Sequence, residues 1–549
     1  MAETKSEVQE SPGGTSYKEM EENMGTPDVH SVGVKIERAR EIYKAYAGVE
    51  EKPTKSEVLG WYFYGLCSYF VHTVLIPIVF PLIISQTVFD PPEPPQGWSK
   101  SYMGLECKPN QTRLYEGLIH RSISNSNFSS LEWTSISWAG GLILSAPILG
   151  ILSILLDYGH NQQLIAGVAT AVGALFCLPA GFVQKSWIFP PYVAAIVVAN
   201  TIGAAAHARH LGLMIRGHIG LTIRKSQFPD RKTFASWLSL YSTASGCLGA
   251  AILSSFTYHM LRKSDHFTAL WVVSIFSGLI WGLGMAHIFS TNRLTSSLTT
   301  SSSSNSIPKT HVISIFKYPH AAGSLAGVFL SSFTTMCIFA AGLLYATGYL
   351  CVKPVTLLYL WLTYFMFPLV SLPLAHPLQQ LIKADAVKMQ LLGFLLSILT
   401  SGFGFYYRQD NWHKHHLLLF AGIQSTATGL LHAFGRVLWL ECSPAGKEGA
   451  FSVWFSWVRA LGTCAGFALA TALPGNIGIA FGTAFCAGIV GMLILIFGNI
   501  SSFGGAKAAG HVIKSEKASP VLELDNSDAD GVDVKVGVEV KVAPGTVEV

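Results

Sequence analysis

One arginine lies deep inside an apolar stretch of this chain, about eight residues beyond its start near Phe451: this is Arg459. At 1.5 Å of rise per helical residue, that depth is roughly 12 Å. A guanidinium there can hold a carboxylate with two parallel hydrogen bonds, so Arg459 is a candidate anchor for an organic anion or an amino acid. A second interpretation stays open, in which neighbouring helices supply its partners. Trp457 is a candidate for packing against the apolar part of a bound solute.

Three further polar residues interrupt apolar stretches: His72, Asn200 and Gln424. Polar side chains are costly in hydrocarbon unless they are paired or hydrated, so such positions are candidates for solute binding. His72 could bind solute or exchange a proton, or it could be a hydrogen-bonded residue of the core. The two amides could contact solute, or they could tie helices together, which is the commoner use of such groups.

Charged residues gather where apolar stretches end. Asp157 and Arg436 lie at or just inside such ends. We predict that these two form part of a gate, because a salt bridge that closes in one state and breaks in another gives a carrier its two states. Glu441, Lys447 and Glu448 lie in the same region, where solvated loop charges are the alternative interpretation.

Two histidine groups are spaced somewhat like the histidine boxes of lipid desaturases, His207 with His210 and the group His413, His415 and His416. The ligands of one metal must converge within a few ångström. We expect the two groups at opposite ends of membrane helices, so we predict no metal site. The chain has no P-loop, paired Cys-x-x-Cys or metalloprotease motif either, so neither an enzyme nor a cofactor is predicted.

The elements that would position these residues are membrane helices. Half of the residues are hydrophobic and 13% are charged, against roughly 25% charged residues in soluble proteins. Crossing a hydrocarbon layer roughly 30 Å thick takes about 20 helical residues. We therefore predict an all-α polytopic protein of the lipid bilayer with about twelve spans, and the net charge of +5 gives no reason to expect nucleic acid. The spans are predicted at 60–85, 133–156, 164–183, 189–208, 234–260, 267–290, 321–348, 355–376, 390–407, 416–439, 451–472 and 476–498.

The orientation follows from the basic residues, which cluster before the first span and after the fourth. The positive-inside rule makes both clusters, and hence both termini, cytosolic. The long loop after the first span then lies on the other side and carries two predicted glycosylation acceptors, Asn110 and Asn127. Cys107 and Cys351 fall on that side as well, and whether they pair stays open.

The chain divides into two related parts. We predict a cytosolic tail at 1–56, a six-helix half at 57–290, a Ser/Thr-rich cytosolic linker at 291–319, a second six-helix half at 320–499 and a disordered cytosolic tail at 500–549. The segment from Ser145 to Asp157 and the segment from Ser371 to Lys383 share a serine, a proline, three apolar positions and a terminal charge in register, six spans apart. Such an internal repeat is typical of two-half transporters.

This layout is that of the major facilitator superfamily, and three motifs resemble one family within it. They are GWYFY at 60–64, PILG at 147–150 with DYG at 157–159, and PAGKEGAF at 444–451. Together they resemble the autophagy-related vacuolar effluxer family. The resemblance implies a secondary-active carrier that moves neutral amino acids from the vacuole lumen to the cytosol, and hence a vacuolar membrane. Proton coupling, a different organic anion as solute, and a non-transporting sensor or scaffold all stay open.

Overall fold

The computed structural model describes a little over four hundred residues of the chain, in fourteen ranges. The predicted glycosylation acceptor Asn127, the linker at 291–311 and the tails at 1–51 and 513–549 lie outside the described residues. The described ranges are 52–88, 99–100, 106–107, 109–121, 123, 128–158, 162–182, 185–220, 223–263, 270–290, 312–409, 412–444, 446–474 and 476–512.

Before the linker, the described residues form nine α-helices, which lie among short 3-10 and π-helical segments and two short strands. The α-helices are α3 (Lys55–Ser68), α4 (Phe80–Val88), α5 (Pro109–Ile119), α6 (Ser130–Tyr158), α7 (Gln162–Cys177), α8 (Phe189–Ile219), α9 (Phe228–Lys263), α10 (Trp271–Leu283) and α11 (Ala286–Ser290). The π-helical segment is η1 (Val71–Val79), and the 3-10 segments are η2 (Leu178–Gly181), η3 (Ser186–Ile188) and η4 (Lys225–Gln227). The antiparallel strands are β1 (Ser99–Lys100) and β2 (Glu106–Cys107).

After the linker, the described residues form eight more α-helices. They are α12 (Pro319–Leu344), α13 (Pro354–Met366), α14 (Pro368–Leu381), α15 (Ala386–Tyr406), α16 (Lys414–Glu441), α17 (Glu448–Ala472), α18 (Ile477–Phe497) and α19 (Ser502–Ala508). A 3-10 turn, η6 (Ile313–Lys317), precedes α12, and a π-helical turn, η7 (Tyr345–Tyr349), follows it.

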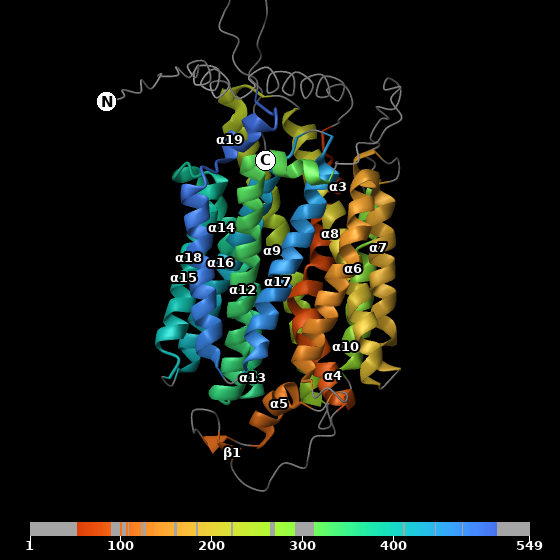
Figure 1. The fold of residues 1–549 in the computed structure, drawn as a ribbon, viewed down its shortest axis with the longest axis vertical. Helices are drawn as coiled ribbons and strands as arrows, with labels where there is room; N and C mark the ends of the chain where they lie inside the picture. The colour runs from red at the N-terminus through yellow and green to blue at the C-terminus, as the bar shows by residue number, and fades with distance from the viewer. Residues whose placement is uncertain are drawn as a thin grey trace, which may run out of the picture. The chain divides into compact units, whose positions relative to one another are not determined.

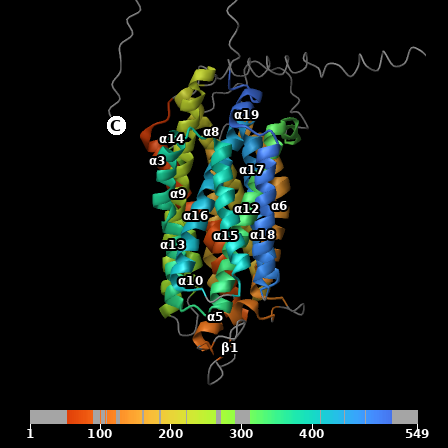
Figure 2. The ribbon, with the colours of Figure 1, turned by 90° about the vertical axis from the view of Figure 1, so that its left-hand side faces the viewer.

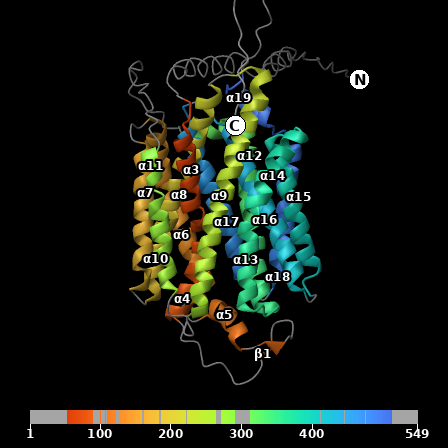
Figure 3. The same ribbon diagram turned by 180° about the vertical axis from the view of Figure 1, so that it is seen from behind.

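Eleven helical segments in the described residues are long and apolar enough to cross a bilayer, and they correspond to eleven of the twelve predicted spans. The remaining prediction, 234–260, falls within α9. This helix has 36 residues and runs alongside the others (Figure 3), but Ser and Thr recur along it and lower its hydropathy below that of the eleven. Two of these hydroxyls, on Ser239 and Thr243, hydrogen-bond to Arg436 of α16.

Within residues 52–512 the long helices lie side by side with roughly parallel axes (Figures 1 and 2). Helix α9 packs on α3 before the linker, but also on α13, α14 and α16 after it. Helix α17 likewise packs on α12 after the linker, and on α6 and α8 before it. We call the helices before the linker and those after it the two groups. Helices α9 and α17, each the fifth long helix of its group, therefore pack against helices of the other group.

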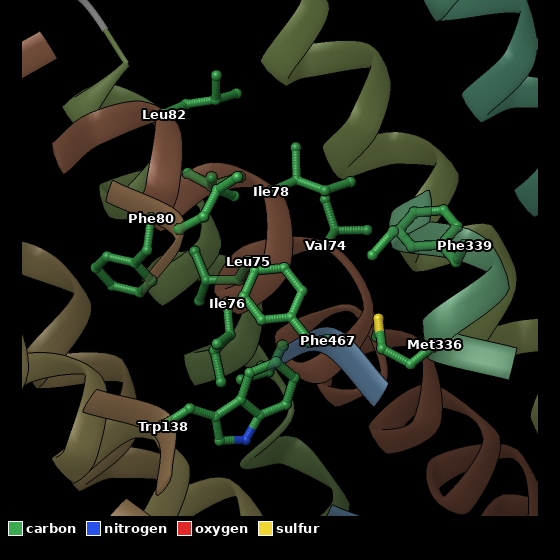
Figure 4. Close-up of a cluster of buried hydrophobic side chains, with 14 of the residues drawn as sticks. Val74, Leu75, Ile76, Ile78, Phe80, Leu82, Trp138, Met336, Phe339 and Phe467 are labelled. Carbon is green, nitrogen blue, oxygen red and sulfur yellow. The ribbon is translucent and has the colours of Figure 1, made fainter. Parts of the chain in front are cut away.

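The apolar segment η1 and the start of α4 sit at the centre of this packing. Side chains from Val74 to Leu82 are buried, and Figure 4 shows them beside Trp138 of α6, Phe467 of α17 and Phe339 of α12. Pro77 lies inside η1, where it cannot donate a backbone hydrogen bond. Burial among helices from both groups holds this irregular segment in place.

The bundle has two chemically distinct ends. We call the end that carries Arg209, Arg216, Arg231 and α19 the basic end. At the other end, α5 lies across the bundle (Figure 1), and Cys107 is joined to Cys351 by a disulfide with a Cα–Cα distance of 5.9 Å. We call it the disulfide end. The sequence left open whether Cys107 and Cys351 pair, and the structure shows that they do.

Two predicted boundaries are wrong. The predicted tail at 500–549 begins too early, because Ser501 caps the N-terminus of α19 and the helix packs against Phe228 through Phe503. The predicted linker at 291–319 ends too late, because Ile315 in η6 is buried and Trp454 donates a hydrogen bond to the carbonyl of Val312. In both cases short polar segments are ordered by tertiary contacts that the local composition does not reveal. The predicted span 189–208 is too short, because α8 continues to Ile219.

Candidate functional site

Two adjoining cavities, each of about 60 Å³, lie inside the bundle between helices from both sides of the linker. Their walls share five residues from three places in the chain. These are Tyr69 and His72 near the break between α3 and η1, His432 of α16, and Phe455 and Arg459 of α17. We call the two together the central cavity. One part extends along α12 and the other along α8 and α9.

Arg459 supplies a cation to the wall of this cavity. Its guanidinium carbon lies 5.7 Å from the ring centroid of Tyr69, within the range of a cation–π contact. Among the described residues, its side chain makes no hydrogen bond and no ion pair with protein, although its backbone carbonyl accepts from Thr463. The alternative interpretation was that neighbouring helices satisfy the charge of Arg459. In the described part of the chain, no residue does so by a hydrogen bond or an ion pair. The guanidinium keeps its donors free for an anion.

Arg436 also borders the central cavity, but its Nε and Nη2 groups donate hydrogen bonds to α9. Its Nε donates to Ser239 Oγ at 3.0 Å, and its Nη2 donates to the carbonyl of Ser239 at 2.9 Å. Its guanidinium carbon also lies 5.2 Å from the ring centroid of Trp61. Arg436 thus ties α16 to α9 and α3, and it raises the positive potential of the cavity.

Two histidines face the same space. His72 is buried against Trp138, with ring centroids 5.6 Å apart, and His432 lies 5.6 Å from the ring of Tyr69. Both residues border the cavity that Arg459 borders. The structure therefore brings the predicted site residue His72 next to the predicted anchor.

The two predicted amides are separated. Asn200 of α8 is buried and lies on the wall of the central cavity with Arg459. Gln424 of α16 lines a different cavity, which is largely apolar, and its amide bonds Thr400 and Ser397 of α15. Asn200 is placed to contact solute in the central cavity, whereas Gln424 ties α16 to α15.

The predicted site residue Trp457 does not line the central cavity. Its indole nitrogen donates to the backbone carbonyl of Leu142 at 3.1 Å, so the side chain points from α17 toward α6. Residues two apart on a helix face in different directions. For this reason Arg459 and Trp457 cannot both point into the same space.

The sequence analysis missed His432 as a site residue, although a signal was present. Gln424, Thr428, His432 and Arg436 recur every fourth residue along α16. That spacing places them on one face of a helix. A polar row in an otherwise apolar span indicates a face that looks into the bundle, and three of the four residues border the central cavity.

The two predicted gate residues do not pair with each other. The carboxylate of Asp157 on α6 accepts the backbone N–H groups of Gly449, at 2.5 Å, and Ala450, at 3.0 Å, in the first turn of α17. Asp157 therefore caps a helix N-terminus of the other group, an arrangement favoured by the helix dipole. Backbone N–H groups of another helix are thus partners of Asp157, whereas the predicted gate assumed an oppositely charged side chain.

Two buried ion pairs flank this cap at the basic end. Arg216 of α8 is paired with Glu448 of α17, and Arg231 of α9 is paired with Glu441 of α16. Each pair joins a helix before the linker to a helix after it. Glu441 and Glu448 are therefore not the solvated loop charges of the alternative interpretation.

The two histidine groups lie at opposite ends of the bundle, as predicted. His207 and His210 are near the basic end of α8, whereas His413, His415 and His416 are clustered at the start of α16, at the disulfide end. Among the described residues, no group of three His, Cys, Asp or Glu side chains has a geometry that could hold a metal. Asn110 lies in the first turn of α5, at the same end as the disulfide, and its glycosylation stays a prediction.

The fold and this interior define the class of the protein. It is an integral, multi-pass membrane protein of α-helices with an internal cavity, and the guanidinium on the wall of this cavity has no hydrogen-bond or ion-pair partner among the described residues. Comparison with protein-family models and with curated proteins finds no match for this chain. The function must therefore be argued from the cavity.

Proposed function

We propose that this protein is a secondary-active carrier of small organic solutes that bear a carboxylate, with neutral amino acids as the first candidates, and that it works by alternating access. The resemblance of its motifs to the vacuolar effluxer family favours transport from the lumen of a vacuole to the cytosol. The proposal rests on one observation above all. The guanidinium of Arg459, which has no hydrogen-bond or ion-pair partner in the described part of the chain, borders a cavity lined by helices from both groups.

The chemistry of the cavity suits such a solute. A carboxylate can take two parallel hydrogen bonds from Arg459, which faces no competing anion in the described residues. His72, His432 and Asn200 add hydrogen-bonding groups, and Tyr69 and Phe455 add aromatic surface. Ligand sites of this kind combine apolar walls with a few placed polar groups.

The packing of the helices supports a division into two halves that move relative to each other. The two similar segments of the sequence lie in α6 and α14, and these helices occupy corresponding places: α6 packs on α17, and α14 packs on α9. Inverted or parallel repeats arranged around a central site are the common plan of secondary transporters. The division into two related, mobile halves is therefore a part of the proposed function.

Contacts join the two groups at both ends of the bundle. At the basic end, the Asp157 cap and the two ion pairs join them. At the disulfide end, Tyr115 of α5 donates to the carbonyl of Pro474 at 3.2 Å. We infer that the structure is an occluded state, and that alternating access breaks one set of contacts at a time.

The test is transport by the purified full chain in proteoliposomes. Radiolabelled neutral amino acids and other organic anions are offered with and without a pH gradient. We expect at least one carboxylate-bearing solute to accumulate, and Arg459→Ala to weaken its apparent affinity at least about tenfold, because a hydrogen bond to a charged group contributes about 1.5–3 kcal/mol.

Two controls sharpen this test. Arg459→Lys keeps the charge but loses the two-pronged geometry, so we expect an intermediate affinity. Arg224→Ala removes an exposed arginine outside the cavity and should leave transport unchanged. Binding of solutes without movement would identify a sensor instead of a carrier, and an unaltered affinity in Arg459→Ala would make that residue structural.

A further inference from the structure

A second group of titratable side chains lies near the basic end, outside the wall of the central cavity. Glu57 of α3 and His210 of α8 are both buried, and the carboxylate Oε1 lies 2.8 Å from the ring nitrogen Nε2. His287 of α11 is also buried, with its ring centroid 5.3 Å from that of His210. Three helices therefore meet at a carboxylate and two imidazoles that are shielded from lipid.

His207 connects this group of side chains to the central cavity. It lies one helical turn before His210 on α8, and its ring centroid is 6.3 Å from that of His287. It borders both the central cavity and a smaller cavity of about 30 Å³, whose wall includes His210 and His287. A polar cavity of that size holds one or a few waters, and a water between two rings can bridge them. The four side chains thus form a continuous polar path from Glu57 to the central cavity.

The surroundings of this path set its charge balance. Helices α6 and α7 contribute uncharged side chains, including Leu156 and Gln163, and α9 contributes Ser242. Among the described residues, the charged and titratable groups near the path include Tyr64 from α3, Arg209 from α8, Arg436 from α16 on the same cavity wall as His207, and Glu448 from α17. Arg209 and Glu448 have opposite charges, and Arg436 opposes a positive charge on His207. A proton is therefore stabilised at the Glu57 end, next to the carboxylate.

We propose that Glu57 and His210 form a proton-binding site, and that His287 and His207 connect it to the central cavity so that proton movement is coupled to solute movement. This inference rests on the proposed carrier function for the coupling, whereas the binding of a proton at His210 stands on the geometry alone. Imidazole is the side chain suited to taking up and releasing protons near neutral pH, and carboxylate and histidine chains inside membrane proteins are typical proton relays.

The proton balance is simple. In the loaded site, His210 carries protons on both ring nitrogens, and Nε2–H donates to the carboxylate of Glu57. Release of one proton from the ring to water leaves a neutral imidazole that still donates from Nε2. The proton passes through the small cavity to His287 and His207, and each ring accepts a proton on one nitrogen as it gives one up from the other.

The first measurement needs no solute. The full chain, labelled with ¹⁵N-histidine, is placed in lipid nanodiscs, and the ring nitrogen signals are followed by NMR from pH 5 to 8. His210→Gln identifies the His210 signals by their loss. We expect these signals to change between neutral and doubly protonated forms in the wild type and to stay in one form in Glu57→Gln. His210 signals that do not change with pH in the wild type overturn the proton site.

The second measurement tests coupling, with leucine as the probe solute and a pH-sensitive dye inside proteoliposomes. We expect Glu57→Gln and His210→Gln to keep leucine counterflow but to lose leucine-driven proton movement. Wild-type proton movement per leucine in both variants overturns the coupling. His259→Gln, which changes an exposed histidine of α9, is the matched control and should behave as the wild type. If the wild type carries no leucine, the amino-acid proposal fails, while the NMR result still decides the proton site.

Discussion

Arg231 and Glu441 face each other across the basic end: the Nε of Arg231 donates to both carboxylate oxygens of Glu441, at 3.2 and 2.9 Å. The second ion pair, between Arg216 and Glu448, repeats this arrangement on a different pair of helices. Arginine stands before the linker and glutamate after it in both pairs, but the helices are α9 with α16 in one and α8 with α17 in the other. The fourth and fifth long helices of each group are therefore joined crosswise.

Breaking the pair between Arg231 and Glu441 should destabilise the fold strongly. Because both side chains are buried, removal of one partner leaves an uncompensated charge, and Arg231→Ala should lower the free energy of unfolding by about 3–5 kcal/mol. Thermal unfolding in detergent measures this. Arg121→Ala, at the partly exposed pair Arg121–Glu132, is the matched control, with an expected loss of at most about 1 kcal/mol. Equal losses of unfolding free energy in the two variants would contradict the assignment of Arg231 and Glu441 as a buried ion pair.

A side chain at position 449 should separate α6 from α17. A Cβ added at Gly449 would lie 2.7 Å from Asp157 Oδ1 and 2.7 Å from Leu156 Cβ, closer than such contacts allow. Gly449→Ala should therefore weaken the helix cap and lower stability by about 1–3 kcal/mol. Gly150→Ala on α6 meets no atom within 4 Å and serves as the control. Unfolding midpoints that coincide for both variants would argue against close packing at this position.

The docking of α19 should weaken in acid. Burial, and then the charges of Arg231 and Arg216, hold the pKa of His511 well below its ordinary value, and its ring lies 2.9 Å from the carbonyl of Ser443. With the folded pKa below the unfolded value of about 6.5, the undocked segment binds more protons in acid, so stability rises with pH. The stabilisation is complete above about pH 6.5 and declines as the pH falls below it.

Hydrogen exchange of residues 502–508 at pH 5.5 and 7.5, corrected for intrinsic rates, measures this. We expect faster exchange at the lower pH in the wild type. His511→Gln has no titratable ring and should show the same corrected exchange at both pH values. A wild-type segment whose protection does not depend on pH would rule out the mechanism.

Two cysteines should be protected from alkylation until the protein is reduced. Cys107 and Cys351 form a disulfide over a sequence separation of 244 residues. In the denatured, unreduced chain we expect seven alkylated cysteines, which are the free ones, and two more after reduction. Cys107→Ser should lower stability by about 2–4 kcal/mol, whereas Cys486→Ser, at an exposed free thiol, should have little effect. Mass spectrometry that finds nine reactive thiols without reduction would exclude the bond.

The sequence alone determined the membrane class and the helices. Whether a segment can cross hydrocarbon depends on its own length and side chains, and for this reason eleven predicted spans were recovered. The depth of Arg459 within its span and the separation of the two histidine groups follow from the same local counting. The predicted span 234–260, within α9, is not among the eleven, because its hydroxyl groups face partners in other helices and lower its hydropathy.

The tertiary structure decided which side chains meet. Asp157 bonds to backbone of α17, Arg436 bonds to α9, and Trp457 faces α6, and none of these partners lies near its residue in the sequence. A helix fixes the spacing of its own side chains, but its rotation and its neighbours are set by packing over the whole bundle. The central cavity, with the guanidinium of Arg459 on its wall, is a product of that packing. The path from Glu57 to His207 is also a product of packing. Its four side chains come from three helices, and the sequence alone does not show that these helices meet.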